Sequence, residues 1–289
     1  MTKTLLSFGY GLSARTLAPH LLAQGWRVIG TTRSDDKVNA IRETGAEALI
    51  WPPGDCAPAL ADATHLLISA APSAEGDPVL RALADTIAKA KNLQWVGYLS
   101  TTGVYGDHQG GWVDETTPLT PATQRGLWRK DAEAAWAAIP NLPLHIFRLA
   151  GIYGPGRGPF AKLRNGTARR IIKENQLFSR IHVDDIAQVL LASIARPNPG
   201  AIYNLCDDNP APPQEIIAYA AELLGLPVPP AVAFEDAELT PMARSFYAES
   251  KKVHNSRIKD ELGVTLKYST YKDVLQAMLA SEKDYVSEK

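Results

Sequence analysis

The chain has 289 residues, of which 45% are hydrophobic and 21% charged, and its 30 Lys+Arg against 31 Asp+Glu leave a formal net charge of −1. These proportions are typical of a globular protein with enough material for a hydrophobic core. Because binders of nucleic acid or anionic membranes need a basic excess, we expect neither partner.

The composition also excludes several special classes. The start MTKTLLSFGYG becomes glycine-rich too early for a signal peptide. No apolar run approaches the roughly 20 residues that a bilayer requires. Two distant cysteines, Cys56 and Cys206, are too few for a disulfide framework or a zinc site. We therefore predict a cytoplasmic protein without a bound metal.

Short apolar runs alternate with longer mixed ones over the first 150 residues. Each short run is bounded by Gly, Pro or polar residues, which is typical of a buried strand. The alternation predicts parallel pairing through right-handed crossovers, and therefore an α/β, doubly wound parallel sheet of the Rossmann type. We expect strands at 4–8, 27–31, 47–50, 65–70, 95–100 and 144–149, and helices at 13–24, 77–90 and 123–138.

The helix predicted at 123–138 has apolar residues at helical spacing. Its buried side is expected to include Leu127, Ala134, Ala135 and Ala138.

Beyond residue 150 the pattern loosens. The Gly- and Pro-rich stretch 151–160 predicts a loop. Prolines at 210–213 and 227–230 separate the remaining elements: helices at 184–195 and 214–224, a strand at 201–206 and a helical C-terminus. The chain is thus expected to form a sheet domain over 1–155, to which 178–206 return, and a smaller, mainly helical lobe over 207–289.

A glycine-rich turn follows the first strand and precedes the first helix. In a G-x-G-x-x-A string the first glycine allows a tight turn, the second lets the backbone approach a pyrophosphate, and the small third residue lets the helix pack on the sheet. A merely structural turn is the alternative. The string predicts that residues 1–155 bind NAD(P) through Gly9, Tyr10, Gly11, Leu12, Ser13 and Ala14.

The second strand ends at Thr32-Arg33-Ser34 instead of at the carboxylate that usually bonds the NAD ribose, although Asp35 and Asp36 follow. A guanidinium with neighbouring hydroxyls suits the 2′-phosphate of NADP. The pattern favours NADP over NAD, with a solvated surface arginine as the alternative.

Six separated stretches occur in an order that resembles the extended short-chain dehydrogenase/reductase superfamily, the group of nucleotide-sugar epimerases and dehydratases. They are Leu-Ser-Thr-Thr-Gly-Val-Tyr-Gly from Leu99, Asp-Glu-Thr-Thr-Pro at 114–118, Arg-Gly-Leu-Trp-Arg-Lys at 125–130, Phe-Arg-Leu-Ala-Gly-Ile-Tyr-Gly-Pro-Gly from Phe147, Arg-Ile-His-Val-Asp-Asp-Ile-Ala from Arg180, and Ala-Ile-Tyr-Asn-Leu from Ala201.

The resemblance implies a catalytic hydroxyl at Thr101 and a lysine at Lys130, which would also contact the cofactor. The proton-donating tyrosine of the family falls on Gly126. Tyr153 and His182 are possible substitutes, with cleft packing and cleft-shaping hydrogen bonds as their structural alternatives. Two other Tyr-x-x-x-Lys stretches, beginning at Tyr247 and Tyr268, follow no suitable strand, and we interpret both as coincidental.

The resemblance also suggests supporting residues. Asp55 would contact adenine or cap a turn. Small residues Ala70, Ala71 and Pro72 would let the backbone approach the cofactor, and Leu149, Ala150 and Ile152 would flank the nicotinamide.

Four basic residues between the two lobes, Arg164, Arg169, Arg170 and Lys173, are expected to form a solvated helix face. Arg157 and Arg180 are expected near the mouth of the cleft, where they would suit an anionic substrate, with ordinary surface arginines as the alternative.

Two functions remain. One is an NADP(H)-dependent oxidoreductase or epimerase-like enzyme acting on a small molecule beside Thr101. The other is a non-catalytic redox sensor or interaction protein on the same fold, for which Gly126 is the motivating residue. Helices such as 77–90 and 123–138 also allow a homodimer of the kind that extended relatives form.

Overall fold

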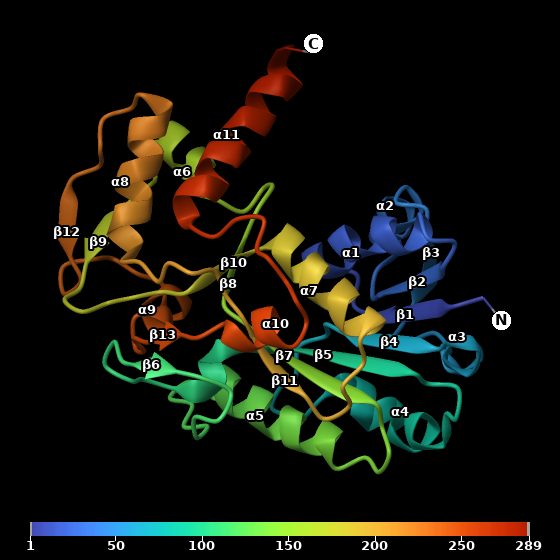
Figure 1. The fold of residues 1–289 in the computed structure, drawn as a ribbon. Helices are drawn as coiled ribbons and strands as arrows, with labels where there is room; N and C mark the ends of the chain where they lie inside the picture. Colours follow the sequence, from blue (N-terminus) through green and yellow to red (C-terminus); the bar gives the residue numbers. More distant parts are fainter. Residues whose placement is uncertain (1, 288–289) are drawn as a thin grey trace.

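A seven-stranded, all-parallel sheet forms the centre of the protein in the computed structural model, which describes residues 2–287 and the side chains of residues 2–281 (Figure 1). The strand order is β11-β7-β5-β4-β1-β2-β3, so the chain builds outward from β1 in one direction and then returns to build outward in the other. This order confirms the predicted doubly wound Rossmann sheet. The strands are β1 (Thr4–Phe8), β2 (Arg27–Thr32), β3 (Glu47–Ile50), β4 (His65–Ile68), β5 (Trp95–Thr101), β7 (Leu144–Leu149) and β11 (Ile202–Leu205).

Helices cover both faces of this sheet, as Figure 1 shows for α1 and α7 on one side and α4 and α5 on the other. Every helix and strand predicted above, apart from the C-terminal helix whose bounds were left open, begins and ends within two residues of its expected limits. The helices around the sheet are α1 (Leu12–Leu22), α2 (Val38–Arg42), α3 (Ala57–Asp62), α4 (Pro78–Lys89), α5 (Gln124–Ala137), α7 (Val183–Ala195) and α10 (Ser256–Asp260), with short 3₁₀ turns at η1 (Asp35–Lys37) and η2 (Thr102–Tyr105).

The buried side of α5 differs from the prediction. Leu127 is 39% exposed, and the three alanines expected inside also face outward. The helix instead buries Ala132, Trp136 and the charged Glu133. The apolar pattern was misleading because the inward face carries a carboxylate, which is paired with an arginine of the sheet.

The stretch 151–160 is not wholly a loop. Its first residues form β8 (Gly151–Tyr153), which pairs in parallel with β10 (Arg180–His182). The expectation was wrong there because the strand is only three residues long and its partner lies almost 30 residues further on, so that no local signal marks it.

A second hydrophobic cluster forms the core of a smaller lobe, at the upper left of Figure 1. It combines Phe160 and Leu163 with apolar residues of α8 and α11, so the segment between the two predicted domains packs partly with the C-terminal lobe. The basic stretch near residue 170 is here a strand, not a helix face. The lobe contains α6 (Phe160–Arg164), β9 (Arg170–Ile172) paired with β12 (Ala231–Ala233), α8 (Pro213–Leu224), α9 (Pro241–Phe246) and α11 (Tyr271–Ser287).

A short parallel ladder joins the lobe to the sheet domain. β13 (Lys252–Val253) pairs with β6 (Trp112–Val113), which lies in the long connection after β5. Val113 and Val253 are both buried beside Tyr105 and Cys206. The ladder therefore brings residues near 250 to the carboxyl end of β5.

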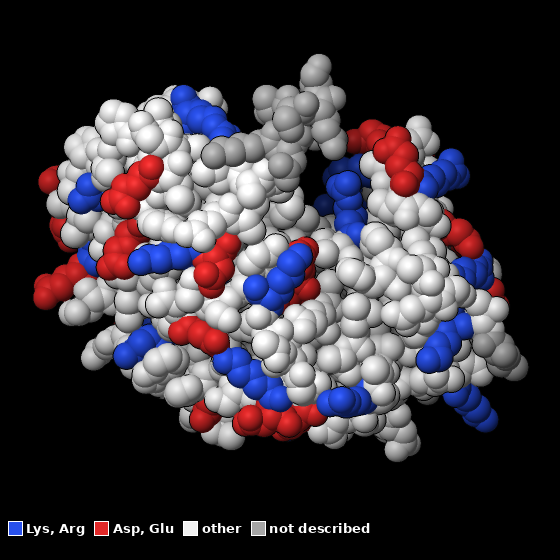
Figure 2. Space-filling view, turned by 45° about the horizontal axis from the view of Figure 1, so that its top comes forward, with Lys and Arg blue, Asp and Glu red and all other residues white. Residues whose placement is uncertain are grey.

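The surface in Figure 2 carries interspersed acidic and basic side chains, in keeping with the net charge of −1. None of the helices within residues 2–287 is long and apolar enough to cross a membrane. Over the same residues, no three His, Cys, Asp or Glu side chains gather as a metal site requires.

Candidate active site

The glycine-rich turn lies between β1 and α1. Gly9 adopts φ +88°, and a Cβ there would lie 2.7 Å from Ser69 Oγ, so the position accepts only glycine. Ser69 Oγ donates to the Gly9 carbonyl at 2.8 Å. The turn is thereby fixed to the end of β4.

The N-terminus of α1 is open to a ligand. A Cβ on Gly11 would meet no protein atom within 4 Å, and α1 begins there with no side-chain cap and no acidic residue in its first turn. Ala14 is buried, so the helix packs closely on the sheet. Free N–H groups and the positive end of the helix dipole suit a pyrophosphate. The turn therefore fits the dinucleotide that the sequence predicts.

Tyr10 of the turn points away from this opening. Its ring packs over Gly30, where a Cβ would lie 2.3 Å from Tyr10 Cδ2, and its hydroxyl hydrogen-bonds Thr44 Oγ1 at 2.7 Å. Tyr10 can thus reach a cofactor only through its backbone.

The end of β2 presents an exposed arginine, Arg33. Beside it, the Thr32 hydroxyl and the Ser34 backbone hydrogen-bond each other at 3.3 Å. Further along, Asp55 Oδ1 accepts from the Ala57 N–H at 2.8 Å, which is a turn-capping contact at the start of α3.

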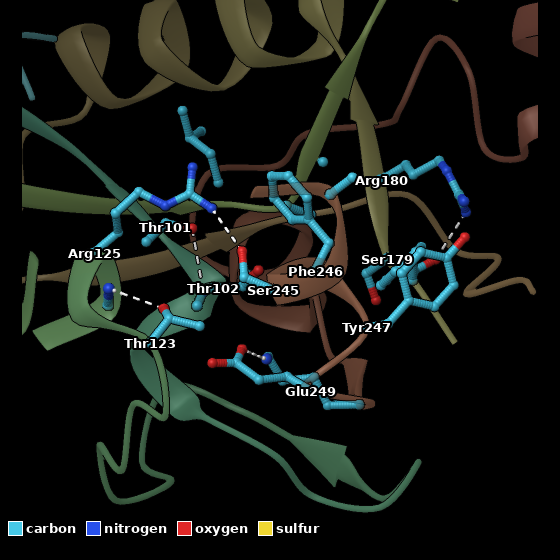
Figure 3. A pocket seen from close by; sticks show the side chains of 18 of the residues that line it. Thr101, Thr102, Thr123, Arg125, Ser179, Arg180, Ser245, Phe246, Tyr247 and Glu249 are labelled. Atoms are coloured by element: carbon cyan, nitrogen blue, oxygen red, sulfur yellow. Dashed lines mark hydrogen bonds and ion pairs between the residues drawn. The ribbon is translucent and has the colours of Figure 1, made fainter. Parts of the chain in front are cut away.

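A cavity of about 900 Å³ opens at the carboxyl ends of the central strands (Figure 3). It is lined by Ala71 and Pro72 after β4, Thr101 at the end of β5, and Leu149 and Ala150 at the end of β7. The structure thus brings together five residues that the sequence analysis predicted around the cofactor and substrate.

Two predicted neighbours lie behind this wall, outside the cavity lining. Ile152 packs on the hydrophobic core that includes α1 and α7. The Ala70 N–H donates to the Phe8 carbonyl at 3.0 Å.

Thr101 is oriented by the turn that follows it. Its Oγ1 accepts from the Gly103 N–H at 3.1 Å, so the hydroxyl proton can still be donated into the cavity. A hydroxyl held in this way can bind a carbonyl or alcohol oxygen of a substrate.

Lys130 is not brought into the cavity. Its Nζ donates to the Leu119 carbonyl at 3.1 Å, whereas Arg125 and Arg129 of the same helix line the cavity. Arg125 and Arg129 are four residues apart and share a helix face. The expected lysine geometry is therefore displaced by one residue along α5.

Gly126 packs so closely against Pro121 and Gly103 that no side chain fits at this position. A Cβ at this position would lie 2.9 Å from the Gly103 carbonyl oxygen and 2.7 Å from Pro121 Cβ. Gly126 lies in the first turn of α5, where its N–H donates to the Thr123 hydroxyl at 3.2 Å. The family's tyrosine could not be accommodated there without moving the backbone.

Tyr153 and His182, the two suggested substitutes, lie outside the cavity lining. Tyr153 donates to Asp207 Oδ2 at 2.6 Å, and burial together with the Asp207 charge raises the pKa of the phenol. His182 Nδ1 accepts from the Asp184 N–H and caps α7, while burial lowers the pKa of its imidazole. Both contacts are structural.

The far wall of the cavity contains residues that sequence reasoning missed. Tyr247, Glu249 and Lys251 all line it, although the Tyr-x-x-x-Lys spacing around them was interpreted as coincidental. Lys251 Nζ donates to Glu249 Oε2 at 2.7 Å. The only available signal was that spacing itself, and nothing in the sequence showed that this segment returns to β5.

Basic residues predominate around the cavity. Its lining includes six lysines and arginines but only two glutamates, Glu238 and Glu249. Arg180 belongs to this set, whereas Arg157 is exposed outside the lining. The six basic residues are Arg125, Arg129, Lys162, Arg169, Arg180 and Lys251.

A buried polar network supports the strand ends beneath Thr101. Arg148 Nη2 donates to Glu133 Oε2 at 2.8 Å, and Arg148 Nη1 donates to the Tyr105 hydroxyl at 2.9 Å. Glu133 also accepts from the Ser100 hydroxyl, next to Thr101. The network joins β5, β7, η2 and α5, so it fixes the end of β5, where Thr101 lies.

Comparisons with known proteins agree with this architecture. No family model matches the chain. Protein YeeZ of Escherichia coli K12 is 31% identical over 280 residues, covering 92% of this chain and 96% of YeeZ. A conserved protein of unknown function from Silicibacter pomeroyi DSS has a solved structure with a TM-score of 0.94 at 65% identity, covering 97% of this chain and 99% of that one.

A third similar protein, from Methylobacillus flagellatus and assigned to the NAD-dependent epimerases/dehydratases, has a TM-score of 0.70 at 27% identity and covers 98% of this chain and 99% of its own. The chain belongs to the extended short-chain dehydrogenase/reductase superfamily of NAD-dependent epimerases and dehydratases and, within it, to the family of YeeZ.

Proposed function

We propose that the protein is an NADP(H)-dependent oxidoreductase or epimerase-like enzyme that acts on an anionic small molecule. The observation that carries this proposal is one cavity whose lining contains Thr101, the ends of the central strands and six lysines and arginines. The similar Methylobacillus flagellatus protein is named NAD-dependent, which supports a nicotinamide cofactor for this fold.

Each part of the proposed site has a defined task. The backbone of Gly9–Ala14 binds the pyrophosphate at the start of α1. Leu149, Ala150 and Pro72 flank the nicotinamide, and Thr101 donates a hydrogen bond to the substrate oxygen. The bound dinucleotide supplies or accepts a hydride at its nicotinamide ring. The basic residues of the lining attract the negative group of the substrate.

Arg33 tests the preference for NADP. Arg33→Ala should weaken NADPH binding about tenfold or more while NADH binding changes less than threefold, because charge-assisted hydrogen bonds to the 2′-phosphate are lost. Fluorescence titration with both cofactors measures the ratio. Arg42→Ala, which alters an exposed arginine in α2, is the matched control. An equal loss for both cofactors would contradict the assignment.

The enzymatic proposal is tested by following NADPH absorbance with UDP-glucose, UDP-glucuronate, dTDP-glucose and simple carbonyl compounds. Thr101→Val should lower kcat about 100-fold, as removal of one preorganised donor does in other enzymes. Thr116→Val, at an exposed turn, should keep the wild-type rate. Unchanged turnover in Thr101→Val would contradict the role of this hydroxyl.

A second candidate function, a non-catalytic NADP(H) redox sensor or interaction protein, is favoured by the closed contact at Gly126. It predicts cofactor binding with no turnover across the panel, and a protein partner whose affinity depends on the oxidised-to-reduced ratio. Calorimetry that detected no binding of any nicotinamide dinucleotide would exclude both functions.

We also propose a homodimer. The outward face of α5 exposes Leu127 and three alanines, which suits close packing against a second copy. Sedimentation equilibrium should show a dimer that Leu127→Glu converts to a monomer.

A further inference from the structure

The carboxylate of Glu249 lines the same cavity as Gly126, the position at which the family's proton-transferring tyrosine has no room. We propose that Glu249, held by Lys251, is the proton acceptor of the reaction and takes the part of the missing tyrosine. This inference rests on the proposed oxidoreductase function. It adds a catalytic residue that the family's motifs do not contain.

Glu249 and Lys251 form an ion pair inside the protein. Lys251 Nζ lies 2.7 Å from Glu249 Oε2, and both side chains are only 10% exposed. Lys251 Nζ also donates to the Gly106 carbonyl at 2.7 Å, directly after the turn that begins at Thr101. The ammonium thus links the carboxylate to the turn that follows β5.

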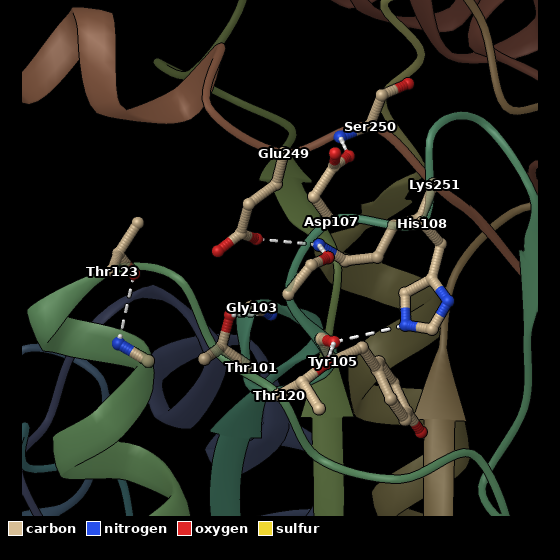
Figure 4. Close-up of polar contacts among 12 residues, drawn as sticks. Thr101, Gly103, Tyr105, Asp107, His108, Thr120, Thr123, Glu249, Ser250 and Lys251 are labelled. Carbon is tan, nitrogen blue, oxygen red and sulfur yellow. Dashed lines mark hydrogen bonds and ion pairs between the residues drawn. The ribbon is translucent and has the colours of Figure 1, made fainter.

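The second oxygen of this carboxylate is left for a ligand. Glu249 Oε1 is buried, and among the described residues none makes a hydrogen bond to it. A buried carboxylate oxygen without a partner is costly, and a donor in the cavity would remove that cost. Glu249 and Thr101 line the same cavity, and Figure 4 shows the carboxylate directed toward the side where Thr101 and Thr123 lie.

The segment that carries Glu249 is rigidly held. Its backbone carbonyl accepts from Gln176 Nε2 at 2.7 Å, and the next N–H, of Ser250, donates to Asp107 Oδ1 at 2.7 Å. The Ser250 carbonyl accepts from the N–H groups of His108 and Gly110. Anchors on both sides hold the carboxylate in place, as preorganised proton transfer requires.

The position on α5 offers no alternative. Gly126 cannot bear a side chain without a shift of its neighbours. The side chains of the helix that line the cavity are Arg125, Trp128 and Arg129, and a guanidinium or an indole N–H is a donor without an acceptor atom. Arg129 also donates to the Leu99 carbonyl at 2.7 Å. Two glutamates line the cavity, and Glu238 is the exposed one. Glu249 is the carboxylate that Lys251 links to the turn after Thr101, so it is the one placed to accept a proton from an alcohol.

The step balances as an alcohol oxidation. The substrate O–H bond breaks and its proton passes to Glu249 Oε1. The adjacent C–H bond breaks, and its electron pair leaves with the hydrogen as hydride to an oxidised nicotinamide dinucleotide. A C=O bond forms from the oxygen lone pair, with Thr101 donating to that oxygen. The carboxyl group then returns its proton to water.

The test compares Glu249→Gln and Glu249→Ala with the wild type, using whichever of UDP-glucose, UDP-glucuronate and dTDP-glucose is oxidised fastest. Glu249→Gln should lower kcat about 100-fold or more and remove the acid limb of the pH profile, because an amide cannot accept the proton. Sodium formate should partly restore the rate of Glu249→Ala. Glu235→Gln, at an exposed position outside the cavity, is the matched control.

A second measurement does not depend on turnover. In the complex with NADPH, which cannot accept hydride, Glu249→Ala should bind the same sugar nucleotide about tenfold more weakly, while Glu249→Gln, which keeps an acceptor oxygen, stays within threefold of wild type. NADPH affinity itself should be unchanged in both variants.

The outcomes separate the two proposals. Wild-type protein that binds NADPH but oxidises none of the three compounds contradicts the proposed function and, with it, this inference. Active wild type with less than a tenfold loss of kcat in Glu249→Gln overturns the role of Glu249 alone. A larger loss that is accompanied by an equal loss of sugar-nucleotide binding in Glu249→Gln also overturns it, because the residue would then only position the ligand.

Discussion

The sheet domain and the smaller lobe contribute to the cavity in different ways. The sheet supplies strand ends whose backbones follow local sequence patterns, and its buried ionic groups, such as Arg148 and Glu133, bond each other. The lobe supplies side chains on a loop that long-range hydrogen bonds hold in place, and one oxygen of Glu249 has no hydrogen-bond partner among the residues that the structure describes. The sheet thus provides a fixed frame, and the lobe provides the groups that remain available for chemistry.

The largest effect on stability is expected at the buried ion pair of the sheet domain, Arg148 with Glu133. Arg148→Ala should lower the free energy of unfolding by about 3–5 kcal/mol, because Glu133 would remain as a buried, unpaired charge. Urea denaturation measures this loss. Glu47→Gln, which removes the partner of Arg27 in an exposed pair, should cost less than about 1 kcal/mol. Equal effects would mean that the frame does not depend on its buried ion pair.

The next effect lies where the two regions meet, at Asp207. Burial raises the pKa of this carboxyl to about 7, well above the value of about 3.9 in an unfolded chain. At this carboxyl the folded state therefore holds a proton that the unfolded state has lost, and the contribution of Asp207 to the free energy of unfolding falls as the pH rises from about 4 to about 7.

Asp207→Asn should remove this contribution. The difference in the free energy of unfolding between the variant and wild type should therefore be on the order of 2–4 kcal/mol more favourable to the variant at pH 8 than at pH 4. Thermal unfolding across this pH range measures it. A wild-type slope that persists in the variant would assign the titration to another group.

Smaller changes in stability are expected from alanine substitutions at two glycines, one in a close contact and one open to a ligand. Gly126→Ala should destabilise the protein by about 1–3 kcal/mol, because its Cβ would press on Pro121 and the Gly103 carbonyl. Gly11→Ala meets no protein atom and should change stability by less than about 0.5 kcal/mol, yet weaken cofactor binding where the pyrophosphate approaches. Chemical denaturation and cofactor titration of both variants distinguish packing from ligand contact. Identical behaviour of the two variants would contradict these opposite assignments.

The same contrast explains what the sequence could predict. The strand and helix ends around the sheet and the fingerprint turn follow from local apolar runs and glycine positions, which act over a few residues. Thr101 was singled out by the resemblance to the extended short-chain dehydrogenase/reductase superfamily. The inward face of α5 was misjudged because it carries Glu133 and Gly126 in place of the apolar residues that a helical pattern counts. Lys130 was singled out by the same resemblance, but Arg129 lines the cavity instead.

Glu249 and Lys251 could not be placed from the sequence for a different reason. They reach β5 through a ladder of two residues on each side, β6 with β13, and through single hydrogen bonds such as Asp107 to Ser250. Because each contact involves only one or two residues and joins segments about 140 residues apart, it produces no hydrophobic periodicity in the sequence.

The small lobe is assembled from separate stretches of chain, with α6 and β9 preceding the last crossover to the sheet, and α8 and α11 following it. No single cut therefore releases it as a module. A chimera that exchanged only the C-terminal third with a relative would pair a foreign α8 with the native α6. Transfer of specificity between members of this family consequently requires grafts at several places in the gene, chosen together.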